Sequence, residues 1–254
     1  SGTLCIDKYQ EKTNDKSLIE GHYYSDKAPL PTLLTIPAFG LIKLLGLVSE
    51  VDGSLYGPAV YYLGNFLCGS LPFALILLFT IRYSIKNGAD PAKTVLLATL
   101  AFFGSFIFVF SGTYFGHMLS GLFFLLAFLE LEDKKYWLAG LFAGLSFLSE
   151  YTIALVFPIW LFQILYTQRK IKPALNYILG LFPSIILILI YNYQFTGSPF
   201  SMLYKFHAFQ ELHSNYGFSL PTADYLWGLS LSSYRGLFVY EPFYSYILSW
   251  ELIP

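Results

Sequence analysis

The feature that most constrains the fold is a succession of apolar segments that fills the middle of the chain. Six such runs occupy residues 58–81, 93–111, 114–131, 136–150, 151–167 and 174–194. A helix that crosses a membrane needs about 20 mostly apolar residues. Charged residues make up only 12% of the chain, whereas a soluble domain carries about 25%. The sequence therefore predicts an all-α polytopic transmembrane helical bundle.

Polar segments flank these runs, and we expect one transmembrane domain over residues 1–254. Residues 1–57 form an outer loop that carries juxtamembrane helices, 58–194 hold about six spans, 195–241 form a second outer loop, and 242–254 begin a further span. The sequence starts at Ser1 without a Met and ends at Pro254 inside an apolar run. We therefore expect a part of a longer protein that lacks a span at each end.

The polar and broken segments before residue 49 predict helices that do not span. Charges of both signs alternate near Ile6–Ile19, which favours a solvated or interfacial helix. Residues 30–48 are apolar, but prolines, glycines and Lys43 interrupt them. A lysine at the centre of a span costs about 2.5–3.5 kcal/mol on insertion scales. We expect residues 30–48 to lie at the interface or to re-enter the membrane.

One predicted span also indicates how the helices pack. Gly140, Gly144 and Ser146 give it a face of small side chains. Such a face lets two helix backbones approach closely inside a membrane.

Basic residues predict which ends of the spans face the cytoplasm. They form three clusters, at Arg82 and Lys86, at Lys134 and Lys135, and at Arg169, Lys170 and Lys172. An even number of predicted spans separates each cluster from the next, so all three share one side, which the positive-inside rule makes cytoplasmic. Residues 1–29, the 111–117 turn and 195–241 then share the outer face. These outer segments hold the histidines His22, His117, His207 and His213, so we expect any chemistry there.

The opening loop Gly21–Pro31 concentrates aromatic and charged side chains, and its prolines favour an ordered turn. We expect His22, Tyr24 and Asp26 to line a substrate cavity. Lys27 can hold a phosphate through a charge-assisted hydrogen bond. The alternative is that Lys27 only anchors a structural loop, as snorkelling lysines do.

Asp7 is the candidate general base for an acceptor hydroxyl. It lies at the point where a missing first span should leave the membrane. The alternative is an exposed acid on an interfacial helix, and Asp15 is the nearby rival for the same role.

Three further ionisable residues lie at predicted outer edges of spans. His117 and Glu150 belong to the substrate-cavity candidates, because ionisable groups at membrane depth usually face an internal cavity. They can equally form a hydrogen-bonded pair that fixes helix packing. Arg235 can clamp a phosphate bidentately, or it pairs with Glu241.

Several stretches of the sequence resemble the multi-span glycosyltransferases of the GT-C fold. The similarity is to the superfamily of protein O-mannosyltransferases and aminoarabinose transferases, glycosyltransferase families 39 and 83. Ile6-Asp7-Lys8-Tyr9 takes the place of the acidic residue that follows the first span in that family. Residues 25–30 resemble the stretch that ends the first outer loop, and 30–48 correspond to a juxtamembrane helix. Residues 140–150 and 234–238 resemble bacterial members.

The resemblance implies an integral enzyme of a bacterial plasma membrane. It would move a sugar from a polyprenyl-phosphate donor to a lipid, glycan or protein acceptor on the extracytoplasmic face. Asp7 would be the catalytic base, Lys27 and Arg235 would hold the donor phosphate, and His22 and Glu150 would line the cavity.

No metal site is visible in the sequence, although the resemblance leaves room for a divalent metal. Many relatives carry Asp-Glu where this chain has Asp7-Lys8, which argues against a metal or dual-acid role there. Cys5 and Cys68 lack a metal-ligand spacing.

Two other classes of protein remain as alternatives. A transporter or flippase would use His117 and Glu150 as a proton or substrate path, although no internal repeat is evident. A non-catalytic assembly subunit would bind a partner through the aromatic 195–241 loop. The net charge of −1 gives no support for nucleic-acid binding.

Overall fold

The computed structural model describes residues 4–51, 54–56, 58–209, 222–234 and 236–240, and most of them are helical. The helices are α1 (Leu30–Leu44), α2 (Pro58–Asn65), α3 (Leu71–Lys86), α4 (Pro91–Phe103), α5 (Phe106–Ser111), α6 (Gly116–Glu132), α7 (Tyr136–Ser149), α8 (Val156–Gln168), α9 (Ile171–Thr196), α10 (Ala223–Ser230) and α11 (Leu237–Tyr240). Two antiparallel hairpins pair β1 (Lys16–Ile19) with β2 (His22–Ser25) and β3 (Ser49–Val51) with β4 (Ser54–Tyr56). Short 3₁₀ segments are η1 (Asp7–Lys12), η3 (Tyr151–Leu155) and η4 (Leu203–Phe206), and η2 (Phe66–Ser70) is a π-helical segment.

Three helices among the described residues are long and apolar enough to cross a membrane. They run over Ala59–Lys86, Tyr151–Gln168 and Ile171–Thr196. The first joins α2, η2 and α3 without a break, and it extends the predicted 58–81 run by five residues to Lys86. Helices α1, α4 and α7 are apolar but shorter. Length and composition therefore identify a helical membrane protein.

The predicted run over residues 93–111 is not one helix. It divides at Gly104 and Ser105, where α4 ends and α5 begins. Ser105 has extended backbone angles, φ −128° and ψ 170°. An extended residue cannot continue the helical hydrogen-bond ladder, so the prediction of an uninterrupted span there is wrong.

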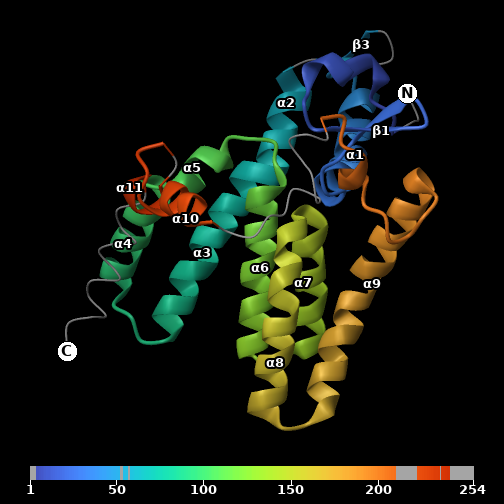
Figure 1. The fold of residues 1–254 in the computed structure, drawn as a ribbon. Coiled ribbons are helices and arrows are strands. Elements are labelled where there is room, and N and C mark those ends of the chain that lie inside the picture. The colour runs from blue at the N-terminus through green and yellow to red at the C-terminus, as the bar shows by residue number, and fades with distance from the viewer. Residues whose placement is uncertain (1–3, 52–53, 57, 210–221, 235, 241–254) are drawn as a thin grey trace.

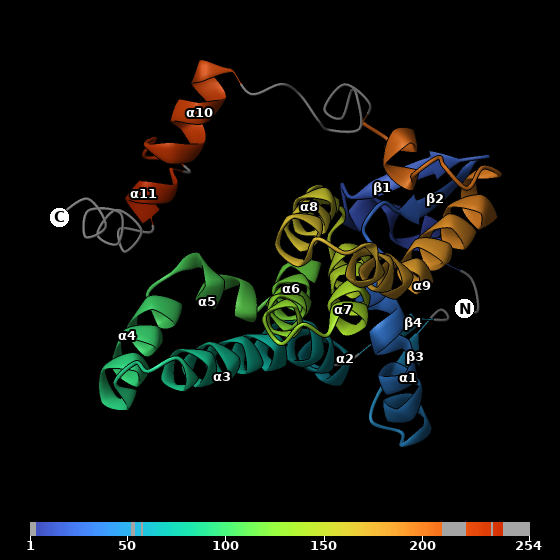
Figure 2. The same cartoon turned by 90° about the horizontal axis from the view of Figure 1, so that it is seen from below.

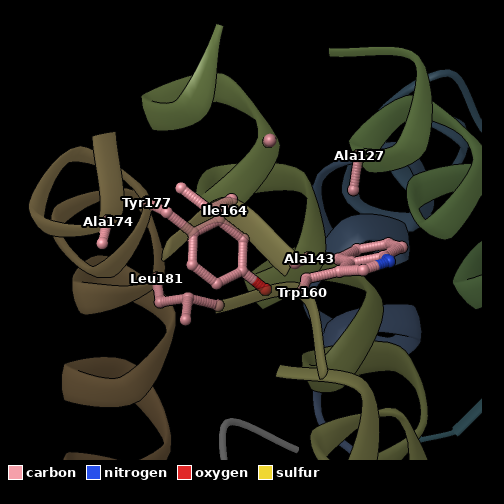
Figure 3. Packing of buried hydrophobic residues seen from close by; sticks show 8 residues of the cluster. Ala127, Ala143, Trp160, Ile164, Ala174, Tyr177 and Leu181 are labelled. Atoms are coloured by element: carbon pink, nitrogen blue, oxygen red, sulfur yellow. The ribbon is translucent and has the colours of Figure 1, made fainter. Parts of the chain in front are cut away.

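Helices α6, α7, α8 and α9 pack together, and α3, α4 and α5 extend to one side of them (Figures 1 and 2). Their shared core contains Ala127, Ala139, Ala143, Trp160, Ile164, Ala174, Tyr177 and Leu181. Figure 3 shows the rings of Trp160 and Tyr177 among the small and aliphatic members of this cluster. Trp160 also stacks on Phe124 of α6, with ring centroids 4.9 Å apart. Large rings from α8 and α9 thus fill the space left by alanines of α6 and α7.

Helices α7 and α9 approach each other closely at their glycines. A Cβ atom added to Gly140 would strike the carbonyl oxygen of Tyr177 and lie 3.0 Å from the Cα of Gly180. A Cβ on Gly144 would collide with the side chain of Ser184. The close packing predicted from the sequence is therefore confirmed for Gly140 and Gly144, whereas Ser146 belongs to a different face of α7. In addition, Ser146 bonds across to α6, where its Oγ lies 2.9 Å from Ser120 Oγ.

The basic clusters lie at one end of the helices. Lys86 at the end of α3 lies 3.4 Å from Asp133 after α6. Helices α7 and α9 run in the same direction, because Gly140 and Gly144 meet Tyr177 and Ser184 in the same order. The starts of α7 and α9, and the basic residues before them, therefore lie at this end too. The β hairpins and the first turn of α1 lie at the opposite end (Figure 1).

The N-terminal segment differs from its prediction as a helix over Ile6–Ile19. Only η1 is helical there, and β1 and β2 form a hairpin with Ile19 opposite His22. The two loop residues, Glu20 and Gly21, have φ of 51° and 84°. Two positive φ angles are the mark of a type I′ turn, whose twist matches that of paired strands. The turn at Glu20 and Gly21 therefore favours a β hairpin here. The alternating charges did not indicate a helix in this segment.

We expect Gly140→Ala to lower the stability of the protein, because the added methyl group would collide with the backbone of α9. Overpacking of this kind costs roughly 1–3 kcal/mol. The measurement is thermal unfolding in detergent. The control is Gly40→Ala in α1, where a Cβ would meet nothing within 4 Å and alanine should leave stability equal or raised by up to about 1 kcal/mol. Equal loss in the two variants would contradict the packing assignment.

Candidate functional site

Two polar segments, distant in sequence, join at the end of the bundle opposite the basic clusters. We call residues 4–29 together with 203–209 the polar cap. Ser17 donates from Oγ to the carbonyl of Leu203 at 2.6 Å, and the amide of Ala208 donates to the carbonyl of Lys16 at 2.9 Å. Ser17 and Leu203 are both buried. Residues 1–29 and 195–241, which were predicted to share one face, are thus in direct contact within the part of the chain described up to residue 209.

A cavity of about 520 Å³, here called the main cavity, lies between the polar cap and the helix ends. Three helices contribute their termini to it: α1 through Pro31, α6 through Gly116 and α7 through Ser149. Its ionisable lining residues are Tyr9, Asp15, Lys27, Tyr114, His117, Glu150, Tyr151 and Tyr204. Carboxylates, one ammonium group and phenol rings thus face a common space at the boundary of the apolar helices.

Lys27 enters the main cavity from the polar cap, and carboxylates hold it. Its Nζ lies 2.9 Å from Asp15 Oδ1 and 3.7 Å from Asp26 Oδ1. The ammonium also lies 5.6 Å from the ring centroid of Tyr204. Partial burial lowers the pKa of Lys27. The hydrogen bond to Asp15 and the negative charge of Asp26 raise the pKa by more, so the net shift is upward. Lys27 is therefore a cation at neutral pH.

Asp26 lies behind the wall of the main cavity, and it does not line it. Its side chain has no exposed surface, and its Oδ2 lies 3.3 Å from Nε2 of the buried His207. Nδ1 of His207 accepts a hydrogen bond from the amide of Phe209. The ring proton of a neutral His207 therefore sits on Nε2, toward Asp26. This buried pair joins the N-terminal part of the polar cap to the 203–209 segment. Asp26 also contacts the ammonium of Lys27.

His117 and Glu150 form the second ionic pair of the main cavity, with His117 Nδ1 3.0 Å from Glu150 Oε2. A close helix contact brings them together. A Cβ on Gly116 would strike the carbonyl of Ser149, so the glycine lets the start of α6 sit against the end of α7. The residues that follow, His117 and Glu150, then become neighbours. His117 also packs on the ring of Phe110 at 4.9 Å.

Asp7 faces a different space from Lys27. It lines a second cavity of about 630 Å³, the hairpin cavity, formed by Leu4, Cys5, Asp7, His22, Tyr24, Gln194 and Phe195. Its Oδ2 lies 2.7 Å from His22 Nδ1, and its Oδ1 accepts from the amide of Tyr23 at 2.6 Å. Hydrogen bonds from Cys5, His22 and the Tyr23 amide lower the pKa of Asp7 to about 2. The hydrogen bond to Asp7 in turn raises the pKa of the Cys5 thiol.

The structure therefore divides the predicted site residues between two cavities. Lys27, His117 and Glu150 share the main cavity, whereas Asp7, His22 and Tyr24 line the hairpin cavity. The family resemblance assigned Asp7 and Lys27 to one catalytic site, but in the structure they line different cavities. Asp15, the rival acid, occupies that place beside Lys27.

Three residues named in the sequence analysis, Arg235, Glu241 and His213, lie outside the described residues. Tyr204 and His207 were recognisable only as members of an aromatic loop, because their contacts are with residues about 180 positions earlier. Cys5 was set aside for want of a spacing motif, although an alternating Cys-x-Asp pattern before a histidine-bearing strand was the available signal.

Comparison of the chain with protein-family models, with curated proteins and with solved structures finds no match. The class that the fold and the composition define is a helical membrane protein with a polar cap at one end.

We expect His207→Ala to destabilise the polar cap, because it leaves the carboxylate of Asp26 buried without its imidazole partner. A loss of roughly 1–3 kcal/mol is typical for a buried group that loses its partner. The double variant His207→Ala/Asp26→Asn removes the charge as well, so it should be more stable than His207→Ala alone. Thermal unfolding in detergent, with proteolysis of the N-terminal segment as a second readout, measures both. A double variant no more stable than the single one would refute the assignment.

Proposed function

We propose that the protein is a glycosyltransferase with a polytopic transmembrane bundle, which moves a sugar from a polyprenyl-phosphate donor to an acceptor at the extracytoplasmic face. The observation that carries this proposal is the main cavity, which places an ammonium, two carboxylates and four tyrosines at the apolar helix ends. The basic clusters at the opposite end support the orientation, since basic loops favour the cytoplasmic side.

The position of the main cavity suits a substrate with a lipid tail and a polar head. Pro31 and Thr32 of α1 line it. The same helix exposes apolar side chains along its length, namely Leu33, Leu34, Ile36, Leu41 and Leu44. A polyprenyl chain can lie in lipid along α1 while its phosphate and sugar reach the cavity. The tyrosines and carboxylates offer stacking surfaces and hydrogen-bond acceptors to sugar hydroxyl groups.

Lys27 is the group that meets the donor phosphate in this proposal. It is the one lysine or arginine among the described residues that line the main cavity. During transfer the bond from the sugar C1 to the phosphate oxygen breaks, and negative charge grows on the departing polyprenyl phosphate. A preorganised cation beside that oxygen stabilises the transition state. Asp15 holds Lys27 in place before the donor arrives. Arg235 stays a predicted second phosphate ligand.

His117 and Glu150 take the acceptor's proton. Because Asp7 faces the hairpin cavity, the base must come from the main cavity. The carboxylate of Glu150 lies 3.0 Å from Nδ1 of His117. In this proposal it accepts the Nδ1 proton and so leaves Nε2 as the proton acceptor, as a carboxylate does for a catalytic histidine. The acceptor oxygen then bonds to C1 as its proton passes to the imidazole. This arrangement also serves a proton path in a transporter, so the experiment must follow bond cleavage.

The test measures conversion of polyprenyl-phosphate sugars to free polyprenyl phosphate in proteoliposomes that contain the protein. A panel of sugars on one carrier should reveal a donor that is consumed with transfer to an acceptor. Passage of intact donor across the bilayer without cleavage would overturn the transferase proposal and favour a flippase. Absence of both cleavage and transport over the whole panel would overturn it as well.

We expect Glu150→Gln to lower the rate of sugar transfer by roughly 10²–10⁴-fold, because positioned acid–base groups contribute about that much. The matched control is Glu130→Gln, which changes a carboxylate paired with Lys135 at the opposite end and should transfer at the normal rate. Equal rates in both variants would exclude the His117–Glu150 pair from catalysis.

Lys27→Ala should reduce transfer by roughly 10²–10³-fold through loss of phosphate stabilisation. Lys27→Arg should retain part of the activity because it keeps the charge. Lys205→Ala changes an exposed lysine of the polar cap that does not line the cavity, and it should behave as the unmodified protein. A Lys27→Ala enzyme with normal turnover would remove Lys27 from the mechanism.

A further inference from the structure

Three side chains with metal-ligating atoms converge at the edge of the hairpin cavity. They are Cys5, Asp7 and His22, and their ligand atoms all lie within 4.8 Å of one another. His22 Nδ1 is the common point, 3.9 Å from Cys5 Sγ and 2.7 Å from Asp7 Oδ2. From this convergence we propose that Cys5, Asp7 and His22 form a binding site for one zinc-class divalent cation.

The backbone brings the three ligands together before any metal arrives. The type I′ turn at Glu20 and Gly21 places His22 at the start of β2. The segment before η1 pairs with the same strand, since the amide of Ile6 donates to the carbonyl of Tyr23 at 2.7 Å and Cys5 bridges to Tyr24. Cys5 and Asp7 flank Ile6 and therefore both reach His22. The ligand set does not depend on folding around the ion.

The distances suit a tetrahedral ion after a small adjustment. Zinc bonds of about 2.3 Å to sulfur and about 2.0–2.2 Å to nitrogen and oxygen imply S···N and N···O separations of roughly 3.6 and 3.4 Å. The S···N separation here is 3.9 Å and the N···O separation is 2.7 Å. An entering ion would replace the hydrogen bond that His22 Nδ1 donates to Asp7 Oδ2, and these two atoms would move apart by about 0.7 Å. Rotation of exposed side chains can supply this movement.

The chemistry of the ligands selects the class of metal. A thiolate, an imidazole and a carboxylate together suit zinc and its borderline-soft neighbours, whereas magnesium and calcium prefer oxygen ligands alone. The second carboxylate oxygen of Asp7 accepts from the Tyr23 amide. A metal-ligating carboxylate is commonly oriented by such an outer hydrogen bond.

Three protein ligands leave a fourth tetrahedral position, which distinguishes this site from a closed structural one. The three ligands line the hairpin cavity, whose other walls include Tyr24, Gln194 and Phe195, so a fourth ligand would come from that cavity. Tyr24 and Phe195 pack with their ring centroids 5.0 Å apart, so the polar cap and the end of α9 both border the proposed site. With a metal bound, water would be the fourth ligand. The inference does not rest on the proposed function, because this cavity is separate from the one that holds Lys27.

The experiment measures metal binding by the full 254-residue chain in detergent after chelator treatment. Equilibrium dialysis against Zn²⁺, with elemental analysis of the protein, should give one tightly bound ion per chain. Co²⁺ in place of zinc should produce the absorption of a tetrahedral site with a thiolate-to-metal charge-transfer band. This measurement uses the unmodified protein and needs no variant to fold. A protein that binds no zinc, or cobalt without a thiolate band, overturns the proposal.

Variants then assign the ligands. Cys5→Ser, Asp7→Asn and His22→Ala should each weaken zinc binding by at least about tenfold, since even outer-shell partners cost about 10–100-fold. The controls are Cys68→Ser and His117→Ala, which change a cysteine and a histidine outside the cluster and should bind zinc normally. Size-exclusion profiles and circular dichroism confirm that each variant is folded. Equal affinity in the ligand variants and the controls would place the metal elsewhere and overturn the assignment.

Discussion

The arrangement of this protein depends on the junction between its N-terminal hairpin and the segment after α9. Ser17 and the backbone of Lys16 bond to Leu203 and Ala208, and Asp26 pairs with His207 beneath the surface. A charge buried without a partner is costly, so the Asp26–His207 pair ties the two segments in one register. The main cavity borders this junction through Lys27 and Tyr204, and the hairpin cavity lies between the hairpin and the end of α9.

Close packing of the helices determines the surface on which the polar cap rests. Glycines at positions 140 and 180 let α7 and α9 touch backbone to backbone, and Gly116 lets α6 begin against the end of α7. The same small-residue contacts that stabilise helix pairs in a membrane thus bring His117 beside Glu150. Close contacts at glycines therefore account both for the packing of α7 against α9 and for the position of the His117–Glu150 pair.

The two cavities divide the polar chemistry by type. The main cavity holds oxygen and nitrogen groups and the ion-paired ammonium of Lys27, the features on which the proposed sugar-phosphate donor depends. The hairpin cavity holds sulfur, imidazole and carboxylate, which suits a metal ion. Asp7 belongs to the second set because the segment before η1 pairs with β2, and this pairing turns its carboxylate toward His22 and away from Lys27.

The sequence alone determined the apolar helices, the common end of the basic clusters and the packing face at Gly140 and Gly144, because hydrophobic length, charge and side-chain size are local properties. Only the tertiary structure decided that Asp15 and not Asp7 accompanies Lys27, that Asp26 is buried against His207, and that Cys5 joins Asp7 and His22. Those contacts depend on a two-residue turn at Glu20 and Gly21 and on pairing across about 180 residues. Long-range pairing produces no periodic pattern in the sequence. The sequence could therefore identify candidate site residues, but it could not predict which of them share a cavity.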